Sequence, residues 1–366
     1  KRNMNICILE EKRKDERRTP IVPKDIIKLK KKYPKWKFYI EPSVRRVFSD
    51  KEYYASGCKK YNSQKIDLFL SVKEISIQKV KKNQNYLMFS HTIKGQKQNL
   101  PLLKKILKND CSLIDYELFK TKENRREIGF GWHAGIIGCY LTLSKILKIK
   151  NKLHQRSTMN DLISQIKKSQ FNNLKILITG DGQVSQGVQF FLNKIGISKS
   201  FYKVLPPNKL YKRLDKKYNL SDLLKGKGTY ESIFNKYIGK YDILLSCHFW
   251  DKKFPKLFNI KDINENFFKI IGDISCDVNG SIPTTIKSTK LNSPYYINQN
   301  TTIMAVDNLP SALPYETSKY FSNSLIKILP KIVQSLNQDS IEEYFISKKG
   351  YLNYRYLNLL NHLIDS

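Results

Sequence analysis

Short apolar segments alternate with longer amphipathic segments from one end of the chain to the other. This alternation is typical of an α/β protein whose sheets are largely parallel. The pattern predicts strands at residues 5–9, 37–40, 67–72, 86–90, 112–114, 174–179, 201–205, 242–246, 268–272 and 301–306.

Helices are predicted between these strands and near the C-terminal end. Residues 24–32 form one helix, and residues 129–144 form a buried connecting helix. From Tyr315 onward, Phe321, Leu325 and Ile328 lie on one helical stripe, which Pro330 is expected to interrupt. The polar segment 151–173 is interpreted as an excursion before the next strand, and the charged segment 206–240 is irregular in pattern. Both segments are candidates for mobility.

The most informative segment is residues 174–197, which combines a strand, a glycine loop and a helix. Glycines at 180, 182 and 187 let the backbone approach a pyrophosphate at the start of the helix, where free N–H groups and the dipole favour negative charge. Ser185 stands where the G-x-G-x-x-G pattern has its third glycine, and the alternative is a simple turn. This turn predicts a dinucleotide site formed by Gly180, Gly182, Gln183, Val184 and Gly187.

The net charge of +34 invites a nucleic-acid interpretation, because Lys and Arg bind phosphates. Only 11 residues are Arg, however, and the 55 Lys are spread along the chain beside abundant Asn and Ile. That pattern indicates a compositional bias, in which basic runs are solvated helix faces. We therefore predict no specific nucleic-acid partner.

Membrane insertion and secretion are not predicted either. The longest uncharged stretch near the middle, residues 129–144, is shorter than the ~20 residues that a spanning helix needs. The N-terminal apolar run is too short for a signal peptide. Six Cys without a C-x-x-C pair suit a reducing compartment, so a cytoplasmic protein is predicted. Cys247, His248, Asp273 and Cys276 lack zinc spacing, and no metal is predicted.

Polar side chains repeatedly follow the predicted strands. In open α/β sheets, ligands bind beyond the carboxyl ends of strands, so this regularity predicts a two-domain enzyme with a cleft. The residues at these positions are Lys73, Glu74, His91, Asp115, Glu117, Gly180, Asp273 and Asp307.

Several candidate functional residues also have a purely structural interpretation. Arg18 either binds a substrate carboxylate or lies in a surface turn. Lys73 with Glu74 is either an acid–base group and its partner or a pair at a helix start. A lone His such as His91 is more often structural than catalytic. The carboxylates and arginines between Asp115 and Arg126 fit either ion pairs or recognition of an amino acid.

Seven ordered strings resemble the saccharopine dehydrogenases that form lysine and the related lysine–2-oxoglutarate reductase domain, within the alanine dehydrogenase and transhydrogenase superfamily. The similarity runs nearly from end to end, and the order of the strings makes it specific. The strings are ERRTPIVP at 16–23, VKE at 72–74, FSHTIKGQ at 89–96, DYELF at 115–119, NRREIGFGWHAGIIG at 124–138, DISCDVNGSIP at 273–283 and VDNLPSALPYETS at 306–318.

The resemblance implies two Rossmann-like α/β domains with parallel sheets flanking an active-site cleft. The substrate domain would comprise residues 1–132 plus the C-terminal helices, residues 315–366, and the dinucleotide domain residues 133–314. The implied reaction is the reversible oxidation of saccharopine with NAD(P)⁺ and water to lysine and 2-oxoglutarate, by hydride transfer and imine hydrolysis. A small amino-acid substrate and a monomer or homo-oligomer are expected.

The resemblance also implies roles for single residues. Lys73 and His91 match the acid–base pair. Asp307 matches a position near the nicotinamide. The substrate-pocket positions are Arg18, Lys94, Glu117 and Arg126.

The chain departs from the pattern at the cofactor. No acidic residue follows the second nucleotide-domain strand, where Lys203-Val204-Leu205-Pro206 stands. An acid there would bind the ribose hydroxyls of NAD, so its absence leaves the choice between NAD and NADP open, with Lys203 a candidate partner for the extra phosphate. The resemblance implies NAD as the cofactor, with NADP not excluded. An alanine dehydrogenase-like enzyme and a degenerate nucleotide-binding homologue are the alternatives.

Overall fold

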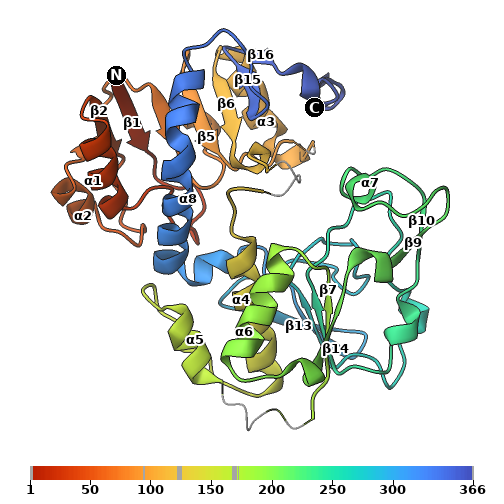
Figure 1. The fold of residues 1–366 in the computed structure, drawn as a ribbon. Helices are drawn as coiled ribbons and strands as arrows, with labels where there is room; N and C mark the ends of the chain where they lie inside the picture. Colours follow the sequence, from red (N-terminus) through yellow and green to blue (C-terminus); the bar gives the residue numbers. More distant parts are fainter. Residues whose placement is uncertain (1–2, 94, 122–125, 167–170, 172, 365–366) are drawn as a thin grey trace. The chain divides into compact units, whose positions relative to one another are not determined.

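A computed structural model describes residues 3–93, 95–121, 126–166, 171 and 173–364 (Figure 1). The chain forms two compact units. Unit 1 combines residues 1–129 with 314–366, and unit 2 comprises residues 130–313.

Unit 1 contains an eight-stranded sheet in the order β16-β15-β6-β5-β4-β1-β2-β3. The six strands from the first part of the chain are parallel, whereas β15 and β16 join antiparallel from its C-terminal part. The strands are β1 (Met4–Ile8), β2 (Trp36–Ile40), β3 (Lys59–Lys60), β4 (Leu68–Leu70), β5 (Asn85–Met88), β6 (Ser112–Asp115), β15 (Phe345–Lys348) and β16 (Tyr351–Leu352).

The α-helices among the described residues of unit 1 are α1 (Pro23–Lys32), α2 (Asp50–Ala55), α3 (Leu100–Lys108), α8 (Pro314–Ser335) and α9 (Leu359–Ile364). Pro23 begins α1, where its missing N–H costs nothing. Helix α8 belongs to unit 1 although it is distant in sequence, and the Ser322 hydroxyl in α8 donates to Asp25 of α1 at 2.6 Å. These long-range contacts make the C-terminal part integral to unit 1.

The expected break at Pro330 is wrong, because α8 continues through it to Ser335. Proline removes one backbone hydrogen bond, but Leu329, Ile332 and Val333 around it are buried. Burial of this apolar stripe outweighs the lost bond. Beyond α8, Lys348 is almost fully buried, and its ammonium donates to the carbonyls of Ser335, Gln338 and Ser340.

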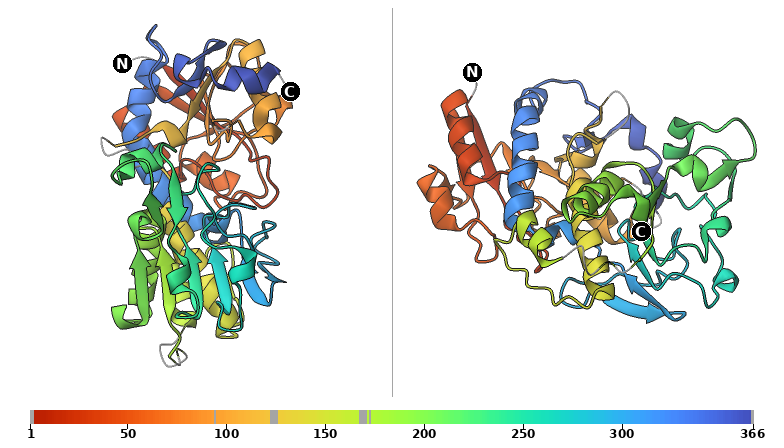
Figure 2. Two further views of the ribbon diagram at one scale, coloured as in Figure 1. Left: turned by 90° about the vertical axis from the view of Figure 1, so that its right-hand side faces the viewer. Right: turned by 60° about the horizontal axis from the view of Figure 1, so that its bottom comes forward.

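Unit 2 contains a six-stranded sheet in the order β13-β14-β12-β11-β7-β8, parallel except for β13. Its apolar residues alternate between two covered faces. Figure 2 shows the ribbon of the chain from two further sides. The strands are β7 (Ile176–Thr179), β8 (Tyr202–Leu205), β11 (Ile243–Ser246), β12 (Ile270–Asp273), β13 (Tyr295–Asn298) and β14 (Thr301–Met304).

Helices α4 (Gly131–Ile146), α5 (Met159–Gln165) and α6 (Gln183–Lys194) cover one face of this sheet. Glycines let α4 and α6 approach until their backbones touch. A Cβ added at Gly135 would lie 1.9 Å from the Val184 carbonyl oxygen, and one at Gly187 would lie 2.0 Å from the Trp132 carbonyl oxygen. The buried helix predicted at residues 129–144 is thus confirmed as α4.

The segment 206–240, whose sequence pattern is irregular, contains regular elements. It forms β9 (Tyr211–Arg213), α7 (Leu220–Leu224) and β10 (Tyr230–Ser232), with β9 and β10 pairing antiparallel. Leu210, Leu223 and Phe234 from this segment are buried in the core on the second face of the sheet. Widely spaced apolar anchors, too few to give a period, hold it in place.

The predicted α/β class with two largely parallel sheets is confirmed, as is the contribution of the C-terminal helices to unit 1. Strands β15 and β16 also come from that C-terminal part and were not predicted. Among the described residues, no helix has the length and apolar character required to cross a membrane.

Candidate functional site

Strands β1, β4, β5 and β6 of unit 1 are adjacent and parallel, so the segments that follow them lie along one edge of the sheet. Four ionisable side chains come from these segments: Glu11 after β1, Lys73 after β4, His91 after β5 and Asp115 at the end of β6. The topology thereby brings together residues separated by about a hundred positions in sequence. This edge is the candidate catalytic site of unit 1.

Glu16 and Arg18 form a buried ion pair at this edge. The Arg18 guanidinium donates to the Glu16 carboxylate through Nε at 2.7 Å and through a terminal nitrogen at 2.6 Å. Burial would raise the pKa of Glu16, but Arg18 outweighs it and holds this pKa below its ordinary value. Both side chains are about 1% exposed or less, so the arginine is held by the protein's own carboxylate.

Glu11 is a second buried carboxyl group, 8% exposed, that connects two strand ends. It accepts hydrogen bonds from the backbone N–H groups of Val72 at 2.5 Å and Lys73 at 3.0 Å. Burial raises the pKa of Glu11 to about 8, and the negative charge of Glu16 acts in the same direction. Glu11 therefore fixes the backbone that carries Lys73.

Lys73 is partly buried beside this pair. Burial lowers its pKa below the ordinary value of a lysine, and the positive charge of Arg18 lowers it further, against the opposing charges of Glu16 and Glu74. A lysine with a lowered pKa spends more time as the neutral amine that accepts protons. Its chemical environment suits acid–base work.

His91 is oriented by the carboxylate next to Lys73. Its Nδ1 lies 2.9 Å from an oxygen of Glu74, and its ring stacks on Phe89 at a centroid distance of 6.5 Å. His91 has a φ of +51°, an uncommon conformation for a residue with a side chain. Burial tends to raise the pKa of Glu74, yet the hydrogen bond from His91 brings it below its ordinary value.

Asp115 and Glu117 lie at the end of β6. Asp115 is fully buried and accepts from the N–H of Ser90 at 2.8 Å and from its hydroxyl at 2.6 Å. Burial raises the pKa of Asp115 to about 6, assisted by the charge of Glu117. Glu117 pairs with Arg126 at 2.6 Å, and half of the Arg126 side chain is exposed.

The structure thus places Arg18, Lys73, His91 and Glu117 on segments at one edge of unit 1, with Arg126 paired to Glu117. Lys94 lies outside the described residues. Sequence reasoning did not assign roles to Glu11 or to Glu16. The available signal was the pair of glutamates at 10 and 11 directly after the first predicted strand.

In unit 2, the glycine turn lies at the carboxyl end of β7, between neighbours β8 and β11 on either side. This is a topological switch point, where open α/β sheets bind ligands. Gly180 has a φ of +84°, and an added Cβ there would lie 2.8 Å from the Cys247 carbonyl oxygen and the His248 Cα. No side chain would fit at this position.

The turn fits a dinucleotide sterically. Gly182 is exposed, and an added Cβ would meet nothing within 4 Å, which leaves room in front of the first residues of α6, Gln183 and Val184. Asp307 is exposed beyond β14 at the same edge of the sheet. Asp181 is also exposed in the turn, and its negative charge opposes phosphate binding.

Lys203 does not lie at this edge. It pairs in register with Leu177 inside β8, and its ammonium lies over the Tyr237 ring at 5.6 Å. The residues that end β8 and follow it are Leu205, Pro206 and Pro207, without an acid or a base. The strand register therefore removes Lys203 as the partner of an extra phosphate.

His248 and Asp273 are buried beyond β11 and at the end of β12. His248 Nδ1 lies 2.8 Å from the Thr179 hydroxyl, and burial lowers the pKa of His248 to about 3. Burial raises the pKa of Asp273 to about 7, against the hydroxyl of Thr285, which favours its ionised form. At pH 7 His248 is thus neutral, whereas Asp273 is close to the midpoint of its ionisation.

These two shifts predict opposite effects of pH on stability. The unfolded Asp273 ionises above about pH 4 and the folded one near 7, so its contribution falls as pH rises through this window, by up to ~1.4 kcal/mol per unit. The contribution of His248 is lost as pH falls from about 6.5 toward 3. Between pH 4 and 6.5 the two effects offset each other.

As pH rises from 4 to 7, the unfolding free energy of the parent should fall by about 2–4 kcal/mol relative to that of Asp273→Asn, which lacks the ionisable group. As pH falls from 6.5 to 4, the unfolding free energy of the parent should fall relative to that of His248→Gln. Urea unfolding at several pH values measures both. Differences that stay constant with pH would contradict the assigned shifts.

Comparison with known proteins adds the following findings. Residues 7–137 match the family model "Alanine dehydrogenase/PNT, N-terminal domain", and residues 208–354 match "Alanine dehydrogenase/PNT, C-terminal domain". An L-alanine dehydrogenase structure has a TM-score of 0.67 at 14% identity and covers 98% of this chain and 100% of its own. A transhydrogenase structure from Sinorhizobium meliloti has a TM-score of 0.65 at 12% identity, and the match covers 95% of this chain and 98% of the transhydrogenase chain. At these identities the structures establish the fold.

Two kinds of curated relative match in sequence. Alpha-aminoadipic semialdehyde synthase of Arabidopsis thaliana is 24% identical over 95% of this chain and 40% of its own length. Saccharopine dehydrogenase [NAD(+), L-lysine-forming] of Schizosaccharomyces pombe is 23% identical over 85% of this chain and 88% of its own length. The chain thus spans about two fifths of the first relative and most of the second.

Proposed function

The chain belongs to the alanine dehydrogenase/PNT family, and we propose that it is an amino-acid oxidoreductase of the saccharopine dehydrogenase type. The proposed reaction oxidises saccharopine with a nicotinamide cofactor and water to lysine and 2-oxoglutarate. The observation that carries the proposal is the cluster of Lys73, His91 and their carboxylate partners at one edge of unit 1. The names of the curated relatives support the substrate.

Lys73 and His91 are the proposed acid–base groups. Lys73, with its pKa lowered by burial and by Arg18, takes a proton from the secondary amine of the substrate. His91, held by Glu74 through Nδ1, exchanges a proton with the water that attacks the imine. Glu11 holds the backbone of Lys73 in place.

Arg126, Glu117, Arg18 and Lys94 are the proposed substrate-binding residues. Arg126 is half exposed and offers a fork to a substrate carboxylate. Glu117, which now pairs with Arg126, is suited to a substrate ammonium group. Arg18 is buried against Glu16, so this pair must open for Arg18 to bind a substrate carboxylate. In the closed pair, the charge of Arg18 lowers the pKa of Lys73.

NAD is the proposed cofactor, bound at Gly180, Gly182, Gln183, Val184 and Gly187, with Asp307 toward its nicotinamide. When bound, it accepts the hydride from the substrate carbon. The chain supplies a turn without side chains and the N-terminus of α6. Residues 205–207 at the end of β8 carry neither an acid nor a base, so they favour neither NAD nor NADP, and the assay below includes both cofactors.

The purified chain mixed with saccharopine and NAD or NADP should generate reduced cofactor, measured by its absorbance. Alanine in place of saccharopine tests the alternative of an alanine dehydrogenase-like enzyme. Reduction with alanine alone would support that alternative. Cofactor binding without turnover of either substrate would support a degenerate homologue.

Gly182→Val is expected to weaken NADH binding by about tenfold or more while changing the unfolding free energy by under about 0.5 kcal/mol. Gly182 has a φ of −80°, and an added Cβ meets no atom, so valine fits the fold but occupies the space in front of α6. Fluorescence titration with NADH and urea unfolding measure the two effects.

The matched control is Gly129→Val, because an added Cβ also meets nothing there and Gly129 lies outside the turn. It should bind NADH like the parent. If the parent, Gly182→Val and Gly129→Val bind NADH with equal affinity, the dinucleotide does not bind at the glycine turn.

A further inference from the structure

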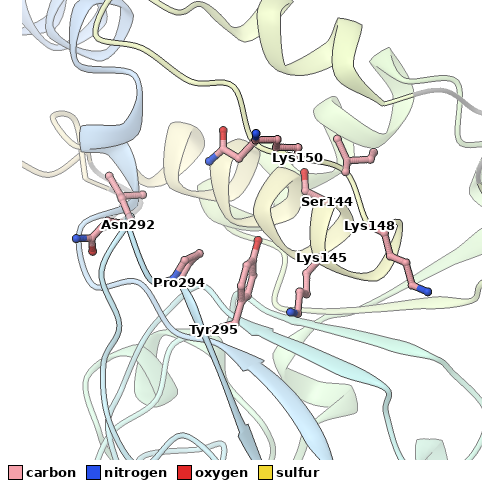
Figure 3. A pocket seen from close by; sticks show the side chains of 10 residues that line it. Ser144, Lys145, Lys148, Lys150, Asn292, Pro294 and Tyr295 are labelled. Carbon is pink, nitrogen blue, oxygen red and sulfur yellow. The ribbon is translucent and has the colours of Figure 1, made fainter.

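A cavity of about 580 Å³ opens in unit 2 at the C-terminal end of α4 (Figure 3). Lys145, Lys148 and Lys150 line it from α4 and the segment that follows, and Tyr295 of β13 lines it from the opposite side. None of the described residues that line the cavity is acidic. Its volume is in the range of small-molecule sites.

Helix α4 ends at this cavity in a Schellman motif. The N–H of Ile149 donates to the Ser144 carbonyl at 2.8 Å, and the N–H of Lys148 donates to the Lys145 carbonyl at 3.2 Å. The position with positive φ, usually glycine, is Lys148 at +55°. A lysine costs more there than glycine would.

The lysines are not required to complete the helix end, because backbone N–H groups already satisfy these two carbonyls. The Lys145 ammonium lies 5.2 Å from the centre of the Tyr295 ring, whose hydroxyl donates to the Leu141 carbonyl at 2.8 Å. Ser144 is 2% exposed and lies beneath the cavity wall. The cavity thus offers the positive charge of three exposed lysines, whereas the buried Ser144 hydroxyl does not face a ligand.

The cavity is distinct from the glycine turn. Helix α4 begins beside that turn, where an added Cβ at Gly131 would lie 3.4 Å from Val184. Its 16 residues span roughly 24 Å, so its other end lies far from the turn.

We propose that this cavity binds a small polyanion through the ammonium groups of Lys145, Lys148 and Lys150. Phosphate and carboxylate groups share the required chemistry, because their oxygens accept charge-assisted hydrogen bonds from ammonium groups. The ligand carries two or more negative charges in a molecule that fits about 580 Å³. This site is independent of the proposed reaction.

Isothermal titration of the full chain with inorganic pyrophosphate and with citrate tests the site and separates phosphate from carboxylate ligands. One probe should bind saturably, and more weakly at higher salt. Lys148→Gly should weaken binding by about tenfold while leaving the fold equally or more stable, since it relieves the positive φ. Lys145→Met should weaken binding to a similar extent.

The matched control is the double variant Lys252→Ala/Lys261→Ala, which removes two exposed charges of unit 2 outside the cavity. It should bind within about twofold of the parent, as expected if distant exposed charges are screened. Gly182→Val should likewise retain binding. The proposal is overturned if neither probe binds, if the control loses as much affinity as Lys148→Gly, or if only Gly182→Val loses binding.

Discussion

Replacing Lys73 by methionine is expected to lower kcat/KM for saccharopine by about 10²–10⁴-fold while the chain stays folded. Methionine retains much of the apolar stem but cannot accept a proton. Lys73 is partly buried beside Glu16, Glu74 and Arg18, and its lowered pKa provides the neutral amine that the proposed reaction uses. Steady-state kinetics across pH measure the loss, and the basic group should disappear from the pH profile.

Lys79→Met is the matched control for this prediction. Lys79 is also partly buried, with 29% of its side chain exposed, and pairs with Glu41 at 2.6 Å outside the cluster. Its loss should change kcat/KM by less than about threefold, since it breaks a partly exposed ion pair and a hydrogen bond to the Glu10 carbonyl but removes no ionisable group of the cluster. If both variants lose activity equally, or if Lys73→Met keeps full activity, Lys73 is not the acid–base group.

Gly135→Val is expected to lower the unfolding free energy by about 3 kcal/mol or more. Its Cβ would lie 1.9 Å from the Val184 carbonyl oxygen, a backbone atom that moves only if α4 and α6 separate. That separation would remove close packing between the two helices and disturb the start of α6. Urea unfolding monitored by circular dichroism measures the effect.

Gly129→Val again serves as the control, because its added side chain meets no neighbour within 4 Å of the Cβ. Gly135→Ala should be intermediate, since alanine favours a helix by up to ~1 kcal/mol but still brings the clashing Cβ. Equal stability of the valine variants at 129 and 135 would refute the close approach of α4 and α6.

Much of the fold could be predicted because its signals are local. The apolar runs Ile176–Thr179 and Ile243–Ser246 became central strands of unit 2. The helix after the glycine turn is observed as Gln183–Lys194, followed by Gly196 with a φ of +82°. Each signal lies within a few residues of the element that it predicts.

The candidate site was predictable only in part. Position after a strand singled out Lys73 and His91, because the carboxyl ends of parallel strands meet at one edge. The same rule does not state which charges pair. Arg18 was interpreted as a carboxylate binder, yet its buried partner in the structure is Glu16, two residues earlier. Local spacing permitted this ion pair but did not distinguish it from an arginine open to a ligand.

The sequence by itself determined the α/β class, the glycine turn and the strand ends that carry ionisable groups, because periodicity and glycine spacing act over short distances. Only the tertiary structure decided which distant segments meet. It added β15 beside β6, continued α8 through Pro330, and removed Lys203 from the cofactor edge by strand register. Those outcomes depend on burial and on contacts between residues far apart in the chain, which no local pattern encodes.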